Sequence, residues 1–265
     1  MRGASLSRLV EIMDRLLAPD GCAWDREQTL TSLRAFLIEE TYEVLEAIDR
    51  DDPALHREEL GDLLMQVVFQ AALRQRSGHF DIDQVVDGIC DKLVRRHPHV
   101  FVAEAEKLDD PSKVLAQWER IKASEKPAGT RVLSGVTVGL PALAHAQKLG
   151  SKASRVGFDW PSWEGSAAKI EEEIAEVREV APGDDADAKH HEIGDLLFAT
   201  VNLARKLGVD AEIALRDASG RFQSRFEHIE DHLAAQGRHP KDASLEELDE
   251  LWNQAKANLA GLSKK

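Results

Sequence analysis

The sequence of 265 residues has few cysteines, few aromatic residues and no long hydrophobic run. Its two cysteines, Cys22 and Cys90, are too few for a disulfide framework, and we expect them to be ordinary buried thiols. No apolar stretch approaches the roughly 20 residues that span a bilayer, and the first segment is charged and amphipathic rather than a signal peptide. These absences predict a cytoplasmic protein with no membrane partner.

Positive charge is also scarce, because the formal net charge is −14. Proteins that bind nucleic acid normally carry a basic surface, so no nucleic-acid partner is expected. A small anionic ligand stays compatible with this charge if cations gather locally. Hydrophobic residues make up 43% of the chain, which is enough to build a substantial core.

Helical periodicity dominates the sequence, and alternating strand patterns are nearly absent, which predicts an all-α fold. Residues 124–141 collect Gly, Pro and Ser and break the periodicity, so we expect a linker there, with a short extended piece around Val132 to Val138. The expected helices cover about 4–18, 29–50, 54–77, 82–96, 111–124, 140–149, 164–181, 186–207, 210–235 and 244–260.

The sequence repeats itself on the two sides of this linker. "LIEETYEVLEA" corresponds to "IEEEIAEVREV", and "REELGDLLMQVVF" corresponds to "HHEIGDLLFATVN", with one constant offset at all the acidic positions. We therefore predict an N-terminal module (1–125), a linker (126–140) and a C-terminal module (141–265). Each module offers only a few helices around a very apolar one, so we expect four-helix-bundle-like cores that a second copy of the chain completes.

Carboxylates occupy helix positions where apolar side chains are expected. At about 100° per residue, Glu173 falls inside the apolar arc of its helix, and Glu176 lies at the edge of that arc. Glu192 and Asp195 are three residues apart in a helix that is apolar nearly all round. Buried carboxylates are costly unless they are paired or bind a metal, so these four residues predict a cation site. A candidate second site in the first module has Glu40, Glu43, Glu59 and Asp62.

The residue types favour one class of metal. An all-oxygen set suits Mg²⁺, with Mn²⁺ as a substitute. A ferritin-like di-iron site is the alternative, but it needs a Glu-x-x-His element, and none of the ten histidines has Glu three residues before it.

Cationic and aromatic residues follow the acidic pairs in both modules. Arg221 and Arg225 share a helix face and could reach phosphate oxygens, and Lys256 follows Trp252 by one turn. An indole beside an ammonium suits a nucleotide, because the ring packs on the base or sugar while the lysine binds phosphate. Corresponding residues of the first module are Lys92, Arg96, Trp118 and Lys122.

The pattern Glu-Glu-x-x-Glu followed by Glu-x-x-Asp, present as "EETYE…ELGD" and "EEIAE…EIGD", resembles the all-α nucleoside triphosphate pyrophosphohydrolases. The two-module layout and the phrases "GCAWDREQT", "LVRRHPHVF", "LPALAHAQK", "VGFDW" and "GDLLFATVNLAR" resemble the MazG family over nearly the whole chain. The resemblance implies Mg²⁺-dependent hydrolysis of NTPs and dNTPs, over a broad range of bases, to the monophosphate and pyrophosphate. It also implies a homodimer, and a role in removing aberrant nucleotides or in nucleotide control under stress.

The resemblance also implies roles for single residues. The metal ligands would be Glu173, Glu176, Glu192 and Asp195, with Glu172 close by in the catalytic set. The nucleotide contacts would be Lys169, Arg221, Arg225, Trp252 and Lys256. The second module would be the catalytic one, although the first keeps its whole acidic set and "KHHEIGD" has histidines where more acid is expected.

These roles predict a metal-assisted attack of water on the α-phosphorus, with Glu172 or Glu173 positioning or deprotonating the water. Two other hypotheses remain open: a metal-dependent nucleotide sensor without turnover, and a helical interaction scaffold.

Overall fold

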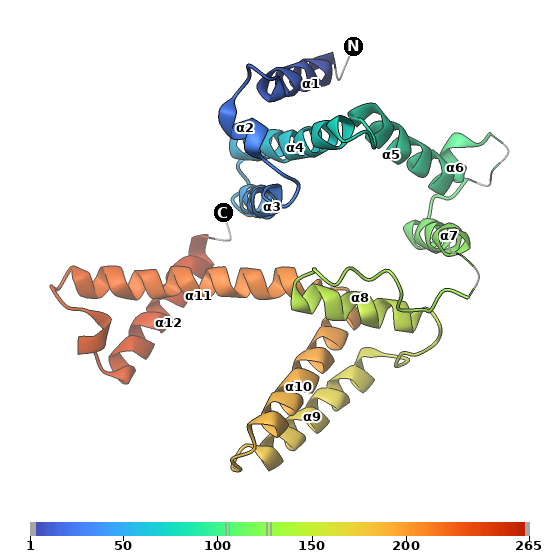
Figure 1. The fold of residues 1–265 in the computed structure, drawn as a ribbon. Coiled ribbons are helices and arrows are strands. Elements are labelled where there is room, and N and C mark those ends of the chain that lie inside the picture. The colour runs from blue at the N-terminus through green and yellow to red at the C-terminus, as the bar shows by residue number, and fades with distance from the viewer. Residues whose placement is uncertain (1–3, 104, 106, 126, 128, 263–265) are drawn as a thin grey trace. The chain divides into compact units, whose positions relative to one another are not determined.

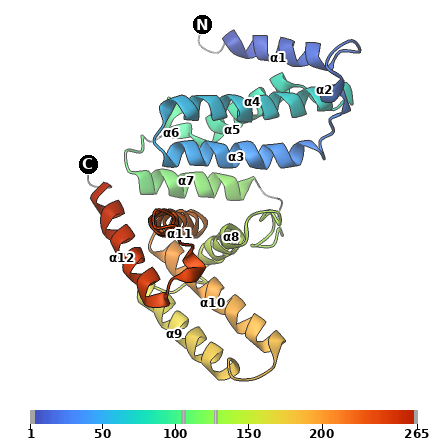
Figure 2. The ribbon, with the colours of Figure 1, turned by 90° about the vertical axis from the view of Figure 1, so that its left-hand side faces the viewer.

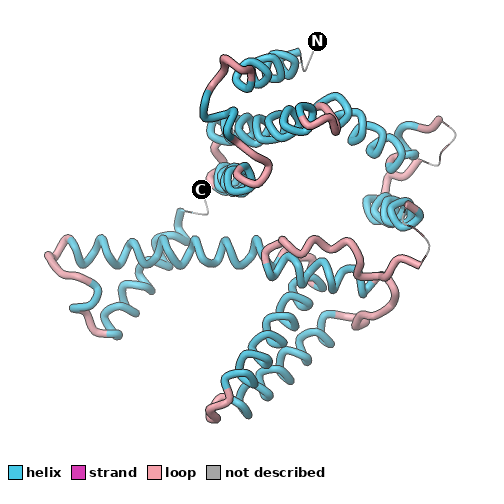
Figure 3. Tube along the Cα trace, in the orientation of Figure 1, coloured by secondary structure: helices cyan, strands magenta, loops and turns pink. Residues whose placement is uncertain are grey.

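The computed structural model describes residues 4–103, 105, 107–125, 127 and 129–262. Within these ranges every secondary-structure element is a helix (Figure 3), so the all-α prediction is confirmed. The extended piece expected around Val132 to Val138 is wrong, because that segment forms turns. Gly135 has a φ of 74°, and the Ser134 N–H donates to the Arg131 carbonyl at 3.0 Å.

The chain divides into two compact units, Met1–Pro127 and Ala128–Lys265. In the first unit, α3 and α4 form an antiparallel hairpin and α1 packs against α4 (Figures 1 and 2). The core of this unit lies where these helices meet, at the buried side chains Met13, Leu17, Leu33, Val68 and Phe69. Its helices are α1 (Ala4–Leu17), α2 (Ala23–Glu27), α3 (Leu33–Asp49), α4 (Pro53–Arg76), α5 (Ile82–Arg96), α6 (Pro98–Phe101) and α7 (Pro111–Ser124).

The second unit consists of two helical hairpins joined to one helix. The first hairpin pairs α9 with α10, and both α10 and α11 pack against α8. The second hairpin pairs α11 with α12 around Ile229, Leu233 and Leu251, and it diverges from the first (Figure 1). The elements are α8 (Ala142–Ser154), α9 (Trp163–Val180), α10 (Ala186–Lys206), α11 (Ala211–Ala234), η1 (Pro240–Asp242) and α12 (Leu245–Leu262).

Matching side chains cap matching helices in the two units. Asp52 accepts hydrogen bonds from the first N–H groups of α4, and Asp185, at the equivalent position of the repeat, does the same for α10. Asp81 and Asp210 form a second such pair, and they cap α5 and α11. A cap of this kind stabilises a helix by about 1 kcal/mol. The repeat therefore extends to the residues that start the helices.

Some local expectations were incomplete. Two short helices, α2 and α6, and the 3₁₀ turn η1 were not predicted. The expected helix at 29–50 begins only at Leu33, because Thr29 and Ser32 exchange side-chain and backbone hydrogen bonds and form a turn before it. Both cysteines are exposed rather than buried: Cys22 directly precedes α2, and Cys90 lies in α5, which has no buried residue.

None of the helices among the described residues has the length and apolar character needed to cross a membrane.

The contact of α8 with α10 depends on Gly150. A Cβ atom at this position would lie 2.6 Å from Oδ1 of Asn202, which is too close. We therefore expect Gly150→Ala to lower the free energy of unfolding by about 1–3 kcal/mol in a urea titration. Gly194→Ala on α10 is the matched control, because its Cβ would meet nothing within 4 Å. It should be neutral or stabilising by up to about 1 kcal/mol. Equal stability of Gly150→Ala and wild type would contradict this account of the packing.

Candidate metal and nucleotide site

Three of the expected ligands in the second module lie together. Glu173 comes from α9, and Glu192 and Asp195 come from neighbouring turns of α10. One carboxylate oxygen of each lies within 4.8 Å of the others. The α9–α10 hairpin thus brings together carboxylates from two different helices, and an all-oxygen set of this kind suits a hard divalent cation.

Glu173 is the buried member of this cluster, with 4% of its surface exposed. Lys169 Nζ binds its Oε1 at 2.7 Å and also binds Oε1 of Glu172 at 2.8 Å. The hydrogen bond from Lys169 holds the pKa of Glu173 below its usual value, so this carboxyl is charged. Its other oxygen, Oε2, is buried and has no hydrogen-bond partner among the described residues. A buried, unpartnered carboxylate oxygen is what a metal ligand offers.

Glu176 lies one turn beyond Glu173 on α9. Its pKa is raised, first by a hydrogen bond to Glu173 and then by burial and by the charge of Glu173. A carboxyl with a raised pKa destabilises the fold once it ionises as pH rises. A cation in the cluster would remove this penalty.

The expectation that all these carboxylates are buried was wrong. Glu192 and Glu176 are half-buried, while Asp195 is exposed. Asp195 lines the cavity described below, while Ile193 and Leu197, two residues before and after it, lie on the opposite side of α10 and are 46% and 51% exposed. His191, at one of the positions where more acid was expected, lies with Nε2 3.3 Å from Oδ2 of Asp195.

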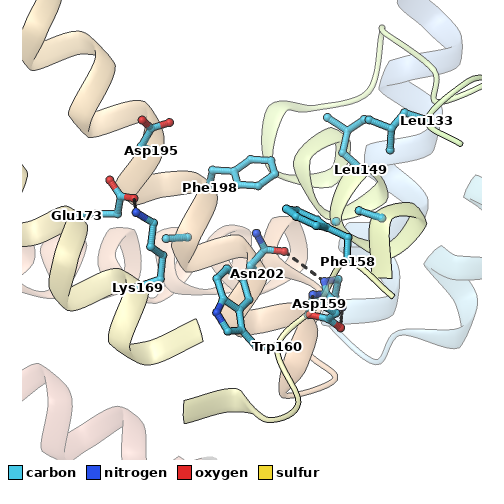
Figure 4. Close-up of a pocket in the computed structure, with 14 residues that line it drawn as sticks. Leu133, Leu149, Phe158, Asp159, Trp160, Lys169, Glu173, Asp195, Phe198 and Asn202 are labelled. Carbon is cyan, nitrogen blue, oxygen red and sulfur yellow. Dashed lines mark hydrogen bonds and ion pairs between the residues drawn. The ribbon is translucent and has the colours of Figure 1, made fainter. Parts of the chain in front are cut away.

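A cavity of about 550 Å³ opens beside the acidic cluster (Figure 4). Lys169, Glu173 and Asp195 line one end of it, and aromatic side chains line much of the rest. The other lining residues include Leu149, Phe158, Trp160, Phe198 and Asn202. A cavity of this size is large enough for a small ligand, and its apolar wall suits an aromatic ring while its charged end suits a metal and phosphates.

An ion-pair network fixes the loop that carries the aromatic wall. Arg205 binds Asp159 through two hydrogen bonds of 3.1 and 2.7 Å, and Lys206 binds the same carboxylate at 3.0 Å. The pKa of Asp159 is lowered to about 2, mainly by the hydrogen bond from Arg205. Arg205 also donates to Oδ1 of Asn202 at 3.3 Å. The end of α10 therefore holds Trp160 beside the cavity.

Sequence reasoning missed these cavity residues. The segment "VGFDW" contains Phe158, Asp159 and Trp160. In the sequence it served only as evidence of a family resemblance, and no role was predicted for its residues. The ion pair with Arg205 joins residues 46 positions apart. No periodic pattern links two positions at that separation. The segment "VGFDW" was therefore visible in the sequence, but its contact with Arg205 was not.

The expected nucleotide contacts do not all lie at this cavity. Lys169 lines it, but the other four stand on the α11–α12 hairpin and are absent from its lining. Arg225 and Trp252 do lie together, with the guanidinium carbon 5.4 Å from the ring centroid. Nε of Arg225 is buried without a hydrogen-bond partner among the described residues, and Arg221 and Lys256 are exposed.

The first module has a similar acidic cluster without a lysine. One oxygen each from Glu40, Glu43 and Glu59 lies within 4.8 Å of the others, and all three residues are half-buried. The pKa of Glu40 is raised by burial and by the charge of Asp62. Phe36 stands at the position of the repeat that corresponds to Lys169, so no ammonium is available there. The same acidic pattern therefore has a different electrostatic environment in each module.

Comparison with known proteins identifies the family. The model of the MazG nucleotide pyrophosphohydrolase domain matches residues 28–101 and, a second time, residues 162–233. The chain belongs to the MazG nucleotide pyrophosphohydrolase family. This membership confirms the expected duplication and the expected enzyme class, a pyrophosphohydrolase. Both acidic clusters fall inside the matched ranges.

Full-length relatives support the same assignment. A nucleoside triphosphate pyrophosphohydrolase from Escherichia coli K12 is 46% identical over 95% of this chain and 97% of its own. The nucleoside triphosphate pyrophosphohydrolase/pyrophosphatase MazG from Thermotoga maritima is 44% identical over 96% of both chains.

A crystal structure of a MazG-related protein from Thermotoga maritima is 29% identical over 44% of this chain and 98% of its own, with a TM-score of 0.38.

The unpartnered oxygen of Glu173 predicts a metal-dependent gain in stability. We expect Mg²⁺ or Mn²⁺ to raise the melting temperature at neutral pH, because the ion binds only the folded cluster. The gain should shrink as pH falls through the raised pKa of Glu176, since protons then relieve the same repulsion. Asp195→Asn should weaken the gain in a thermal-shift measurement.

Glu179→Gln is the matched control, because Glu179 is an exposed carboxylate of the same hairpin outside the cluster. It should keep the full metal response. If Asp195→Asn responds to metal as the wild type does, Asp195 is not part of the site.

Proposed function

We propose that this protein hydrolyses nucleoside and deoxynucleoside triphosphates, over a broad range of bases, to the nucleoside monophosphate and pyrophosphate with Mg²⁺. The observation that carries the proposal is the buried Oε2 of Glu173, which has no partner among the described residues and lies in a three-carboxylate cluster beside a cavity with an aromatic wall. The names of the relatives agree with this reaction.

We assign catalysis to the C-terminal module, residues 141–265, joined by a linker (126–140) to the N-terminal module (1–125). The metal ligands in this proposal are Glu173, Glu176, Glu192 and Asp195. When bound, Mg²⁺ would neutralise phosphate charge and lower the pKa of a coordinated water. Mn²⁺ would serve in its place, because it accepts the same oxygen ligands.

The side chains of the site have separate tasks in the reaction. Lys169 holds Glu172 and Glu173 in place through its two ion pairs and keeps Glu173 charged. One of these two carboxylates accepts a proton from water as the water oxygen attacks the α-phosphorus. The bond from this phosphorus to the bridging oxygen of the β-phosphate then breaks, and pyrophosphate leaves. The aromatic wall at Trp160 and Phe158 packs on the base, and such stacking tolerates any base, which agrees with a broad range.

Cations must stabilise the charge that develops on pyrophosphate, and we assign this task to Arg221, Arg225 and Lys256, with Trp252 as a packing surface. These residues stand on a hairpin that does not line the cavity of its own chain. We propose that a second copy supplies them in a homodimer, packed on the exposed apolar face of α10 at Ile193 and Leu197.

The dimer is expected in sedimentation at micromolar concentration. Leu197→Lys should shift the protein towards monomer and reduce turnover together, because the charge would be buried in the interface. Val138→Lys is the control at an exposed apolar residue of the linker, 89% exposed and outside that hairpin, and it should leave association and turnover unchanged. A monomer with full activity would contradict the shared site.

The position of bond cleavage tests the reaction itself. Triphosphates should yield monophosphate and pyrophosphate in equal amounts, and the release should depend on Mg²⁺. Diphosphate with orthophosphate would place the attack at the γ-phosphorus and refute the mechanism. Metal-dependent binding without any product would instead support the nucleotide sensor.

The two modules can be separated by matched variants. We expect Glu176→Ala to lower kcat by at least a hundredfold, because the catalytic cluster loses a ligand. Glu43→Ala, at the equivalent position of the first module, should keep most of the wild-type kcat, since the first cluster has no equivalent of Lys169. Equal losses in the two variants would show two working sites, and the reverse order would place catalysis in the first module.

A cytoplasmic location belongs to this proposal, because nucleotide pools are found there. Removal of aberrant nucleotides, or control of nucleotide levels under stress, would use the same reaction.

A further inference from the structure

A second group of cations surrounds an indole ring in the first module. The guanidinium carbon of Arg96 lies 5.2 Å from the centroid of Trp118, and Nζ of Lys122 lies 4.7 Å from it. These residues recur at the corresponding positions of the second module as Arg225, Trp252 and Lys256. The first module thus has the cation–aromatic arrangement that the proposed function uses for phosphate.

In the first module, a carboxylate of the chain itself occupies these cations. Glu125, just beyond the end of α7, binds Nη2 of Arg96 through Oε2 at 2.5 Å and Nε of Arg95 through Oε1 at 2.8 Å. Nε of Arg96 also donates to Oε1 at 3.3 Å. The side chains of Arg96 and Glu125 are 15% and 24% exposed. A guanidinium that binds two oxygens of one anionic group would bind a phosphate in the same way.

The second module lacks this carboxylate. At the offset that relates Trp118 to Trp252, the position matching Glu125 is Leu259. Nε of Arg225 is buried without a hydrogen-bond partner among the described residues. The same arginine is therefore satisfied by the chain in one module and unsatisfied at this nitrogen in the other. An unsatisfied guanidinium can accept an incoming anion, whereas Arg96 must first release Glu125.

Charge and space near Trp118 also suit an anionic ligand. Arg95, Arg96 and Lys122 balance three carboxylates, Glu125, Glu119 and Asp109 at the adjoining cavity, so the cations are in excess once Glu125 is displaced. A cavity of about 490 Å³ adjoins the ring, and its lining includes His97, Leu108, Val114 and Leu115. This cavity offers an apolar surface to a nucleoside whose phosphates bind the cations.

We propose that Arg95, Arg96, Trp118 and Lys122 form a second oligophosphate site, for the phosphates of a nucleoside triphosphate, and that Glu125 closes it. The proposal rests on the proposed function only for the class of ligand. It gives a physical reason for unequal modules: the phosphate of a ligand must displace Glu125 in the first module, whereas no described carboxylate binds Arg225 in the second. The lowered pKa of Glu125, about 2, keeps this carboxylate charged at neutral pH.

The test is a calorimetric titration of the full chain with inorganic tripolyphosphate in metal-free buffer. Without metal the acidic clusters repel phosphate, so binding reports on the cations. Glu125→Gln keeps the shape of the side chain and removes its charge. We expect Glu125→Gln to have one additional site for tripolyphosphate. Its Kd should be at least tenfold lower than that of any site in the first module of the wild type. Adding Arg96→Ala to Glu125→Gln should abolish the gain.

The matched control is Glu247→Gln, because Glu247 forms a comparable bidentate pair with Arg238, at 2.5 and 2.7 Å, away from the cation–indole groups of either module. It should gain no site. Circular dichroism checks folding, and Glu125→Asp, which keeps the charge but shortens the reach, should show a smaller gain if Glu125→Gln is unstable. Unchanged binding in folded Glu125→Gln, or a gain that persists with Arg96→Ala, would overturn the proposal.

A second arm replaces tripolyphosphate with a non-hydrolysable α,β-methylene nucleoside triphosphate. Tighter binding of the nucleotide by Glu125→Gln supports a nucleoside in the cavity beside Trp118, and equal binding refutes that part. The wild-type rate of pyrophosphate release tests the proposed function independently of both arms.

Discussion

Repulsion among clustered carboxylates is the constraint around which the second module is built. The α9–α10 hairpin brings Glu173, Glu192 and Asp195 within a few ångströms, and like charges at this distance oppose one another. Lys169 offsets part of the repulsion, but it binds only one oxygen of Glu173. The other oxygen stays buried and unpaired among the described residues. The fold thus tolerates an unfavourable arrangement that a divalent cation would make favourable, as expected for a site whose strain serves binding.

The two modules show how one pattern can give two environments. Their acidic residues, helix caps and cation–indole pairs recur at nearly constant offsets, so their backbones follow the same plan. Two of the differences between the modules change the charges at these sites. Phe36 stands where the second module has Lys169, and Leu259 stands where the first has Glu125. Phe36 leaves the acidic cluster of the first module without the positive charge that Lys169 supplies in the second. Leu259 leaves the arginine of the second module without the carboxylate that Glu125 supplies in the first. Small changes around a repeated framework thus give its two halves different charge environments.

The sequence predicted well what depends on local spacing. Helix periodicity located ten of the helices, and the i, i+3 placement of Glu192 and Asp195 was reproduced. The turn before Leu33 and the short elements α2 and α6 were missed, because few residues and local side-chain bonds decide them. Burial was misjudged for Asp195, since a helix that is apolar nearly all round was taken to be covered on every side, whereas Asp195 itself is exposed. The Asp159–Arg205 pair could not be predicted, as it depends on tertiary packing across 46 residues.

Two features of the second module are incomplete within the described part of one chain, and they are complementary. The apolar face of α10 at Ile193 and Leu197 lies on the side of the helix away from Asp195, and both side chains are about half exposed. The α11–α12 hairpin carries a partly buried guanidinium with an unsatisfied nitrogen. Burying apolar surface away from water lowers the free energy, while a buried hydrogen-bond donor is stabilised only when an acceptor reaches it. A second chain can satisfy the first requirement, and a phosphate held at the acidic cluster can satisfy the second. In the proposed dimer the guanidinium at the cluster comes from the partner, so association of the chains and binding of the nucleotide should stabilise each other.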